Sequence, residues 1–348
     1  MKKMRLALGL LLAVPMLAAQ IANDTPEAHV AIAQTAAGEE YQNLFNFMCA
    51  APAQRGGGGA GARGQGGGAG AGAAAPRGQG GAGAGAAGGA ARGGGGQRAT
   101  PDRSTWYAEP VKAFDNMYFF GQTEYSVWAI TTSEGIIVID TIFDYSIEEE
   151  VDGGMKKMGL DPSKIKYAVV THPHPDHHGG AKFLQDKYGT RVLMSALDWD
   201  ALERTNGTKP TRDIVATDGQ KLTLGDTTIT LVLTPGHTPG TLSVLIPVKD
   251  NGRPHLAALW GGTGLNADRE SLTNYIASAK KFSDIVKQAG ADIILSNHTD
   301  WDRSKINLPI LAKRAPGTPN PYVTSNQNAL RYLKVAQECA TARLMRLN

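Results

Sequence analysis

The chain has 348 residues, which is enough for one large domain or two small ones. Its formal net charge is +3, but five arginines lie in or beside a tract of glycine and alanine, and without them the charge falls to −2. This tract holds 22 of the 43 glycines and almost no large apolar side chains, so we expect a disordered linker at 52–100. The remainder is mildly acidic, which argues against a nucleic-acid enzyme and predicts no nucleic-acid partner.

The first residues have a basic start, an apolar run from Leu6 to Leu17 and small residues after it. This pattern is typical of a secretory signal peptide, which we place at 1–22. The apolar run is short for a membrane span, and no cysteine at its end offers a site for a lipid, so we expect no stable membrane anchor. The sequence therefore predicts a secreted, periplasmic protein.

We expect a short helical segment at 23–51 and, beyond the linker, a catalytic domain at 104–348, in which strand-length apolar runs alternate with helical patterns. The predicted strands are 126–132, 135–140, 166–170, 227–233, 241–248, 255–260 and 291–296. The predicted helices are 146–159, 179–189, 195–205, 271–290 and 326–345. The alternation predicts an α/β domain with sheets inside and helices outside.

The chain has two cysteines, Cys49 and Cys339. In an exported protein such a pair can form a disulfide, which would tie the segment before the linker to the C-terminal helix. Two unpaired thiols are the alternative, because sequence does not give the separation of the two residues.

Three turns that carry histidine each follow a predicted strand. The run THPHPDHHGG at 171–180 follows the predicted strand at 166–170. His237 follows the strand at 227–233, and His298 follows the strand at 291–296. If these strands are parallel neighbours, their ends bring the turns together at one edge of the sheets. Neutral imidazole suits zinc, and a carboxylate among the histidines adds the negative charge that holds a second divalent ion.

The spacing within the run divides the metal ligands into two sets. The first ligand set is His172, His174 and His237. The second ligand set, which lies past the turn, is Asp176, His177 and His298. Each ion would have three protein ligands and open positions for water, which is the catalytic rather than the structural arrangement. A solvated or purely structural histidine cluster is the alternative.

The pattern HxHxDHxG at 172–179, with the later histidines 237 and 298, resembles the metallo-β-lactamase superfamily, and GIIVIDT at 135–141 resembles its preceding strand motif. This resemblance implies a four-layer αβ/βα sandwich with a dinuclear site of two Zn²⁺ ions at one edge of the sheets. Asp140 ends a buried apolar strand, where an unpaired carboxylate is unfavourable. We expect it to orient a ligand histidine or the motif turn, with a turn cap as the alternative.

The stretch LWGGTGLN at 259–266 distinguishes members of the superfamily. Glyoxalase II and the lactonases carry a bridging aspartate in this region, and the B1 β-lactamases a cysteine, whereas this stretch has neither. The remaining pattern resembles the subclass B3 metallo-β-lactamases, and Thr263 and Asn266 lie where relatives hold the substrate. The resemblance and the export signal predict a secreted zinc hydrolase that opens a β-lactam by attack of a metal-bound hydroxide, oriented by Asp176.

Two other functions stay open. The first is a hydrolase of the same fold that acts on a lactone, an ester or a thioester. The second is a metal-binding protein without catalysis, which the intact set of six ligands disfavours. Under the leading interpretation the partner is a small-molecule substrate, and the sequence does not predict the oligomeric state.

Overall fold

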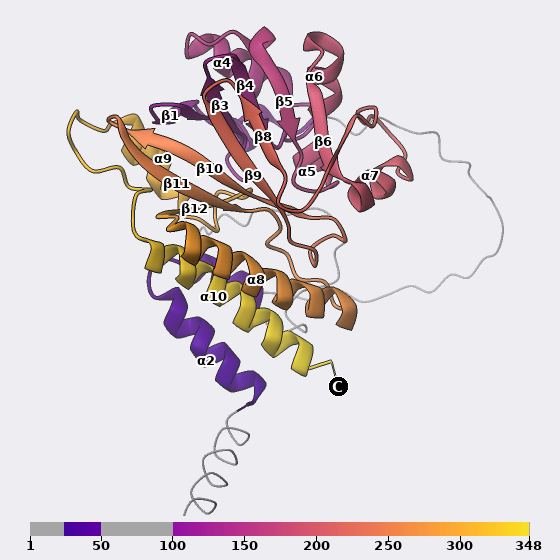
Figure 1. The fold of residues 1–348 in the computed structure, drawn as a ribbon, viewed down its shortest axis with the longest axis vertical. Helices are drawn as coiled ribbons and strands as arrows, with labels where there is room; N and C mark the ends of the chain where they lie inside the picture. Colours follow the sequence, from indigo (N-terminus) through magenta and orange to yellow (C-terminus); the bar gives the residue numbers. More distant parts are fainter. Residues whose placement is uncertain (1–23, 50–99, 348) are drawn as a thin grey trace, which may run out of the picture.

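The computed structural model describes residues 24–49 and 100–347 (Figure 1). The predicted signal peptide at 1–22 and most of the predicted linker at 52–100 lie outside the described residues. Within the described ranges, no helix combines the length and apolarity that crossing a bilayer requires.

Two mixed sheets form the centre of the domain, with strand orders β1-β2-β3-β4-β5-β6-β7 and β12-β11-β10-β9-β8. The first sheet consists of β1 (Val111–Phe114), β2 (Met117–Phe119), β3 (Trp128–Thr132), β4 (Gly135–Ile139), β5 (Ile165–Val169), β6 (Arg191–Ser195) and β7 (Ile214–Ala216). The second consists of β8 (Lys221–Leu224), β9 (Thr227–Leu233), β10 (Leu242–Asp250), β11 (Arg253–Trp260) and β12 (Ile293–Ser296). Strands β4 to β7 are parallel to one another, and so are β11 and β12. The carboxyl ends of these parallel strands therefore lie at one edge of each sheet.

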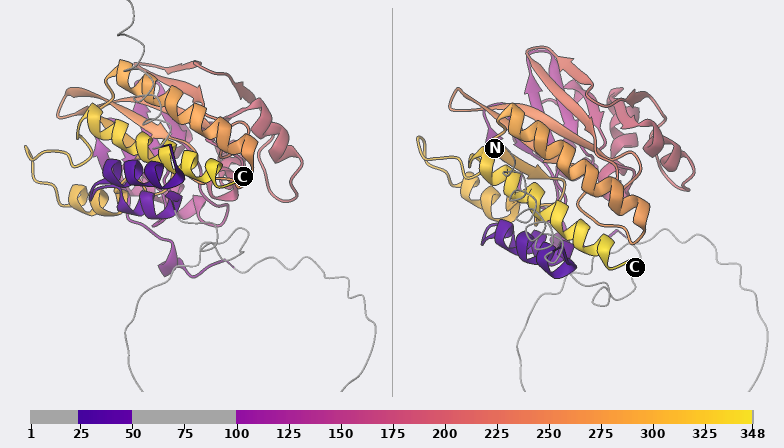
Figure 2. Two further views of the ribbon diagram at one scale, coloured as in Figure 1. Left: turned by 90° about the horizontal axis from the view of Figure 1, so that it is seen from below. Right: turned by 60° about the horizontal axis from the view of Figure 1, so that its bottom comes forward.

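Helices cover the outer faces of both sheets (Figures 1 and 2). The α-helices are α2 (Pro26–Ala37), α3 (Gln42–Cys49), α4 (Gly154–Lys157), α5 (Pro175–His178), α6 (Ala181–Tyr188), α7 (Ala196–Glu203), α8 (Arg269–Ala289), α9 (Ser304–Ala312) and α10 (Asn326–Met345). A core of side chains from both sheets lies between them, and further cores lie between each sheet and its helices. The predicted sandwich, with sheets inside and helices outside, is confirmed.

The structure adds elements that the sequence patterns did not predict. Strands β1, β2, β7 and β8 have only three or four residues each, which is too short for a periodic pattern. Helix α9 contains Pro309, a residue that usually interrupts a helix, and no side chain caps its first turn. Its sequence therefore does not show the usual signal of a helix start. The predicted helix at 146–159 begins with a π-helical turn at Glu148–Gly153 before α4.

The N-terminal helices α2 and α3 pack on α10 and belong to the same core as α8 (Figure 2). Buried Ala33, Ala37, Leu44 and Met48 supply the apolar contacts. Cys49 at the end of α3 forms a disulfide with Cys339 of α10, which decides between the two alternatives for the cysteines. The helical segment before the predicted linker is therefore covalently fixed to α10.

We expect the double substitution Cys49→Ser and Cys339→Ser to lower the free energy of unfolding by about 2–5 kcal/mol, because a cross-link between residues far apart in sequence restricts the unfolded chain. Urea unfolding followed by circular dichroism measures this difference. Wild-type protein treated with a phosphine reductant serves as the control and should unfold like the variant. Unfolding of the variant at the same urea concentration as the oxidised protein would contradict this prediction.

Candidate metal centre

The histidine run follows β5 as a turn that leads into the short helix α5. His174 occupies the N-cap position of α5 with an extended backbone, and Pro175 is the first helical residue, where its fixed φ suits the helix and its missing N–H has no cost. The change from extended turn to helix separates the side chains before Pro175 from Asp176 and His177 after it. This local geometry creates the two ligand sets.

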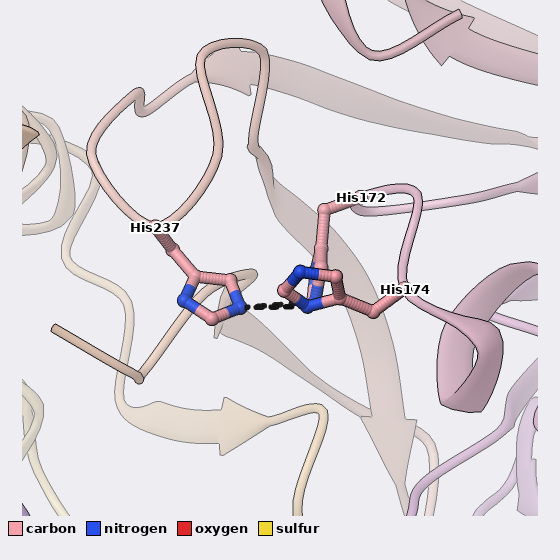
Figure 3. A group of neighbouring side chains, drawn as sticks. All are labelled: His172, His174 and His237. Carbon is pink, nitrogen blue, oxygen red and sulfur yellow. Dashed lines mark hydrogen bonds between the residues drawn. The ribbon is translucent and has the colours of Figure 1, made fainter. Parts of the chain in front are cut away.

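The first ligand set comes together around three facing ring nitrogens (Figure 3). The Nε2 atom of His237 lies 3.2 Å from Nε2 of His172 and 3.2 Å from Nδ1 of His174. Ligand nitrogens about 2.0–2.1 Å from a tetrahedral zinc ion are separated by about 3.3 Å. The observed spacing therefore matches that of zinc ligands.

Backbone carbonyls fix which nitrogens face the centre of the first ligand set. Nδ1 of His172 donates to the carbonyl oxygen of Gly261 at 2.9 Å, and Nδ1 of His237 donates to that of Gly264 at 2.8 Å. Both Nε2 atoms then carry lone pairs, so while both rings are neutral they cannot hydrogen-bond to each other across the contact dashed in Figure 3. A cation between the rings would satisfy both lone pairs.

The second ligand set gathers its ligand atoms within 4.8 Å of one another. The carboxylate of Asp176 lies 3.0 Å from Nε2 of His177 and 3.7 Å from Nε2 of His298. The Nε2 atom of His177 is buried and makes no well-directed hydrogen bond. A buried nitrogen without a hydrogen-bond partner beside a carboxylate is suited to a metal ion.

Asp140 holds the ring of His177 in the second ligand set. Its buried carboxylate accepts hydrogen bonds from Nδ1 of His177 at 2.9 Å, from the backbone N–H of Thr171 at 2.7 Å and from the Thr171 hydroxyl at 2.9 Å. These contacts turn Nε2 of His177 towards Asp176, which is the orienting arrangement that the sequence suggested for Asp140. The residue adopts φ 60°, a strained conformation for a residue other than glycine, held by these bonds.

Burial and neighbouring charges set the protonation of the two ligand sets. Burial lowers the pKa of His172 well below its usual value, that of His237 to about 4 and that of His298 to about 3, so these rings are neutral at pH 7. Burial also acts to lower the pKa of His177, but the carboxylates of Asp176 and Asp140 outweigh it and raise that pKa to about 10. The second ligand set thus stabilises positive charge, which a divalent cation could supply in place of the proton.

The loop after β11 presses its backbone against the first ligand set. A Cβ atom on Gly262 would come within 2.6 Å of Cβ of His237, and one on Gly264 within 3.0 Å of its Cε1 atom. The side chain of Thr263 is buried, with its hydroxyl 3.3 Å from Ser296 Oγ and 3.5 Å from Tyr332 Oη. This placement gives no support to the prediction that Thr263 contacts substrate.

Asn266, the other predicted substrate contact, is exposed and close to the first ligand set. Its amide donates to the carbonyl oxygens of Gly236 and His237, at 3.0 Å each. It therefore fastens the His237 turn to the loop after β11, and a substrate contact of Asn266 stays a prediction.

Sequence reasoning missed Asp198, which is fully buried in α7. Its carboxylate accepts hydrogen bonds from the Thr238 hydroxyl at 2.7 Å and from the Gly240 N–H at 2.9 Å, so it holds the turn that carries His237. Ser195 caps α7 by accepting from the Asp198 N–H, a capping pattern that is visible in the sequence as SALD. That pattern marks a helix start, but the long-range contact of the carboxylate has no sequence signal.

Two aromatic residues beside His298 were also missed as parts of the site. The ring of Tyr125 lies 5.1 Å from that of His298, and the ring of Trp301 lies 6.2 Å from it. Trp301 reaches the site from the segment between β12 and α9, and Tyr125 from the loop between β2 and β3.

Residues 121–250 match the model of the metallo-beta-lactamase superfamily. The chain carries a metallo-β-lactamase domain. Two solved structures similar to it are BJP-1, a subclass B3 metallo-β-lactamase of Bradyrhizobium japonicum, and FEZ-1, a metallo-β-lactamase of Legionella gormanii. BJP-1 is 25% identical with a TM-score of 0.55, and the match covers 66% of this chain and 92% of BJP-1. FEZ-1 is 24% identical with a TM-score of 0.58, and the match covers 67% and 94% of the two chains.

Curated relatives of the domain include enzymes with other substrates. A hydroxyacylglutathione hydrolase of Neisseria meningitidis is 37% identical over 141 residues, which cover 40% of this chain and 46% of that enzyme. An N-acyl homoserine lactonase, AttM, of Azorhizobium caulinodans is 25% identical over 177 residues, which cover 43% and 65% of the two chains. The chain thus spans less than half the length of the first relative. The domain has the metallo-β-lactamase fold, and the relatives it matches are hydrolases.

We expect Asp198→Ala to destabilise the domain by about 2–4 kcal/mol, because it leaves the buried Thr238 hydroxyl and Gly240 N–H without their acceptor. It should also weaken zinc binding by the first ligand set roughly tenfold, since His237 loses its support. Urea unfolding and zinc titration against a chromogenic chelator measure the two effects. Asp198→Asn, which keeps an acceptor for Gly240, is the matched control and should lose much less of both.

The same position should give a pH dependence. Burial raises the pKa of Asp198 to about 6 from 3.8, so the folded protein keeps this proton at pH values where the unfolded chain has released it. The contribution of Asp198 to the free energy of unfolding therefore falls as the pH rises from about 4 to about 6. The difference in unfolding free energy between wild type and Asp198→Asn should shift in favour of the asparagine variant across this range. A constant difference would show that the carboxyl does not titrate there.

Proposed function

We propose that this metallo-β-lactamase domain hydrolyses the amide of a β-lactam with two zinc ions, one held by each ligand set, and that the protein acts in the periplasm. The observation that carries the proposal is the pairing of two complete three-residue sets with a loop at 261–266 that offers neither an acid nor a cysteine. The ring-nitrogen spacing and the unpartnered Nε2 of His177 fit the zinc ions.

Bound zinc would supply Lewis acidity towards a carbonyl oxygen and would lower the pKa of water towards neutrality. The residues around it provide position and charge. His172 and His237 are locked by backbone carbonyls, so they can hold an ion without rearrangement. The Asp176 carboxylate is partly accessible, with 18% of its side chain exposed, so it can accept a hydrogen bond from the attacking water and orient it.

The second ligand set differs from the first by its negative charge. Asp176 and, behind His177, Asp140 place two carboxylates on this side of the centre. Asp176, His177 and His298 would hold a cation there, and it would supply positive charge beside a leaving amide nitrogen and a substrate carboxylate. Both features belong to β-lactams, which carry a strained amide and a neighbouring carboxylate.

A second candidate function is hydrolysis of a thioester or a lactone. The similarity to a hydroxyacylglutathione hydrolase, which is 37% identical over 141 residues, favours it. The acid-free loop at 261–266 favours the β-lactam, since the resemblance implies a bridging aspartate in this region for glyoxalase II and the lactonases.

The metal requirement is tested with purified protein and nitrocefin. We expect zinc-loaded wild type to turn nitrocefin over, a strong chelator to abolish turnover, and zinc to restore it. His172→Ala should lower kcat/KM by roughly 100-fold or more, because it removes one of three ligands. His255→Ala is the matched control, since His255 pairs with Asp292 away from both ligand sets. Full turnover by metal-free protein would refute the two-zinc mechanism.

The substrate class is tested by comparing nitrocefin with S-lactoylglutathione and an N-acyl homoserine lactone under the same conditions. The proposal expects kcat/KM for nitrocefin to exceed the other two by at least tenfold. Turnover of the thioester or the lactone alone would establish the second candidate. Zinc bound without turnover of any of the three would point to metal binding without catalysis.

Cell fractionation with an epitope at the C-terminus tests the periplasmic location.

A further inference from the structure

The ring of His298 is held differently from the rings of His172, His177 and His237. Hydrogen bonds from the outer ring nitrogen orient His172, His177 and His237. Among the described residues, the ring of His298 makes no hydrogen bond, and its Nε2 atom lies 3.7 Å from the Asp176 carboxylate. The backbone of His298 is fixed by a β-bridge to Tyr125, but this leaves the side-chain torsions free.

Aromatic rings take the place of the missing hydrogen bond. The ring of Tyr125 packs edge-on to His298 with a centroid distance of 5.1 Å and an angle of 62°. The indole of Trp301 lies at 6.2 Å, tilted by 37°. The imidazole therefore depends on the position of its two aromatic neighbours.

Trp301 is itself held by the N-terminal segment. Phe47 of α3 stacks on its indole with a centroid distance of 4.3 Å and an angle of 23°. Two residues later, Cys49 is joined to Cys339, so the end of α3 cannot move away from α10. A contact path runs from the disulfide through Phe47 and Trp301 to His298.

We infer that Phe47 is a positioning residue for the metal centre: docked by the Cys49–Cys339 disulfide, it sets the orientation of the His298 imidazole through Trp301. The inference rests on the proposed two-zinc function, because the orientation matters through the ion that the second ligand set holds. It makes the helical segment that precedes the predicted linker part of the catalytic site. Reduction of the disulfide should loosen the second ligand set while leaving the first intact.

The test compares Phe47→Ala with Phe45→Ala. Both remove a half-buried ring from α3 that packs against the same core, but Phe45 makes no ring contact with Trp301. Zinc affinities of the two sets are measured by titration against a chromogenic chelator, and the d–d spectrum of cobalt-substituted protein reports the geometry of the second ion. Neither readout requires turnover.

Phe47→Ala should weaken binding of the second ion roughly tenfold and alter its cobalt spectrum, with the first ion changed less than about twofold. Phe45→Ala should match wild type in both readouts. Phe47→Trp, which keeps a stacking ring, should restore second-ion affinity to near the wild-type value. The Cys49→Ser, Cys339→Ser double variant should fall in the same direction as Phe47→Ala.

Three outcomes overturn the inference. If wild type binds two ions and Phe47→Ala matches Phe45→Ala, the Phe47–Trp301 contact does not position His298, and the proposed function stands. If Phe47→Ala weakens both ions equally, the residue stabilises the domain as a whole. If wild type binds no second ion under saturating zinc, the two-zinc function fails and the inference fails with it.

Discussion

The site depends on the hydrogen bonds between Asp140 at the end of β4 and Thr171 at the end of β5. The Asp140 carboxylate binds both the backbone and the hydroxyl of Thr171, and the Thr171 carbonyl accepts from Leu242 of β10 in the other sheet. The Thr171 hydroxyl also accepts from Asn297, which follows β12. Asp140, Thr171, Leu242 and Asn297 therefore form one hydrogen-bonded cluster that joins the ends of both sheets. Every ligand of the two sets lies on a turn that begins or ends at this cluster.

Backbone carbonyls orient the ligand histidines around this hydrogen-bonded cluster. The Gly261 carbonyl accepts from both His172 and Asn297, and the Gly264 carbonyl accepts from His237. A side chain at Gly262 would collide with His237, so the loop can approach this closely only because it lacks side chains there. The glycines of this stretch therefore allow backbone carbonyls to hold the ligand rings in place.

The sequence predicted what local pattern and ligand chemistry determine. Long apolar strands such as β10, the helices α8 and α10, and both ligand sets follow from periodicity and from histidine spacing, and the structure brings each set together. The rest depends on contacts between distant segments, which no local pattern encodes. Asp198 supports the His237 turn from 40 residues away, and Phe47 reaches Trp301 from the other side of the predicted linker.

The unit that brings both ligand sets together is larger than the residues that match the family model. Residues 121–250 contain five of the six ligands but lack His298, the carbonyls of Gly261 and Gly264, and α10. The second ligand set closes only when β12 pairs with β11 and brings His298 to the sheet edge. Because α10 covers this second sheet and carries Cys339, the disulfide extends the same unit back to α3. We therefore expect the site to tolerate changes in the length of the predicted linker, since the covalent bond to Cys339 holds the end of α3 in place.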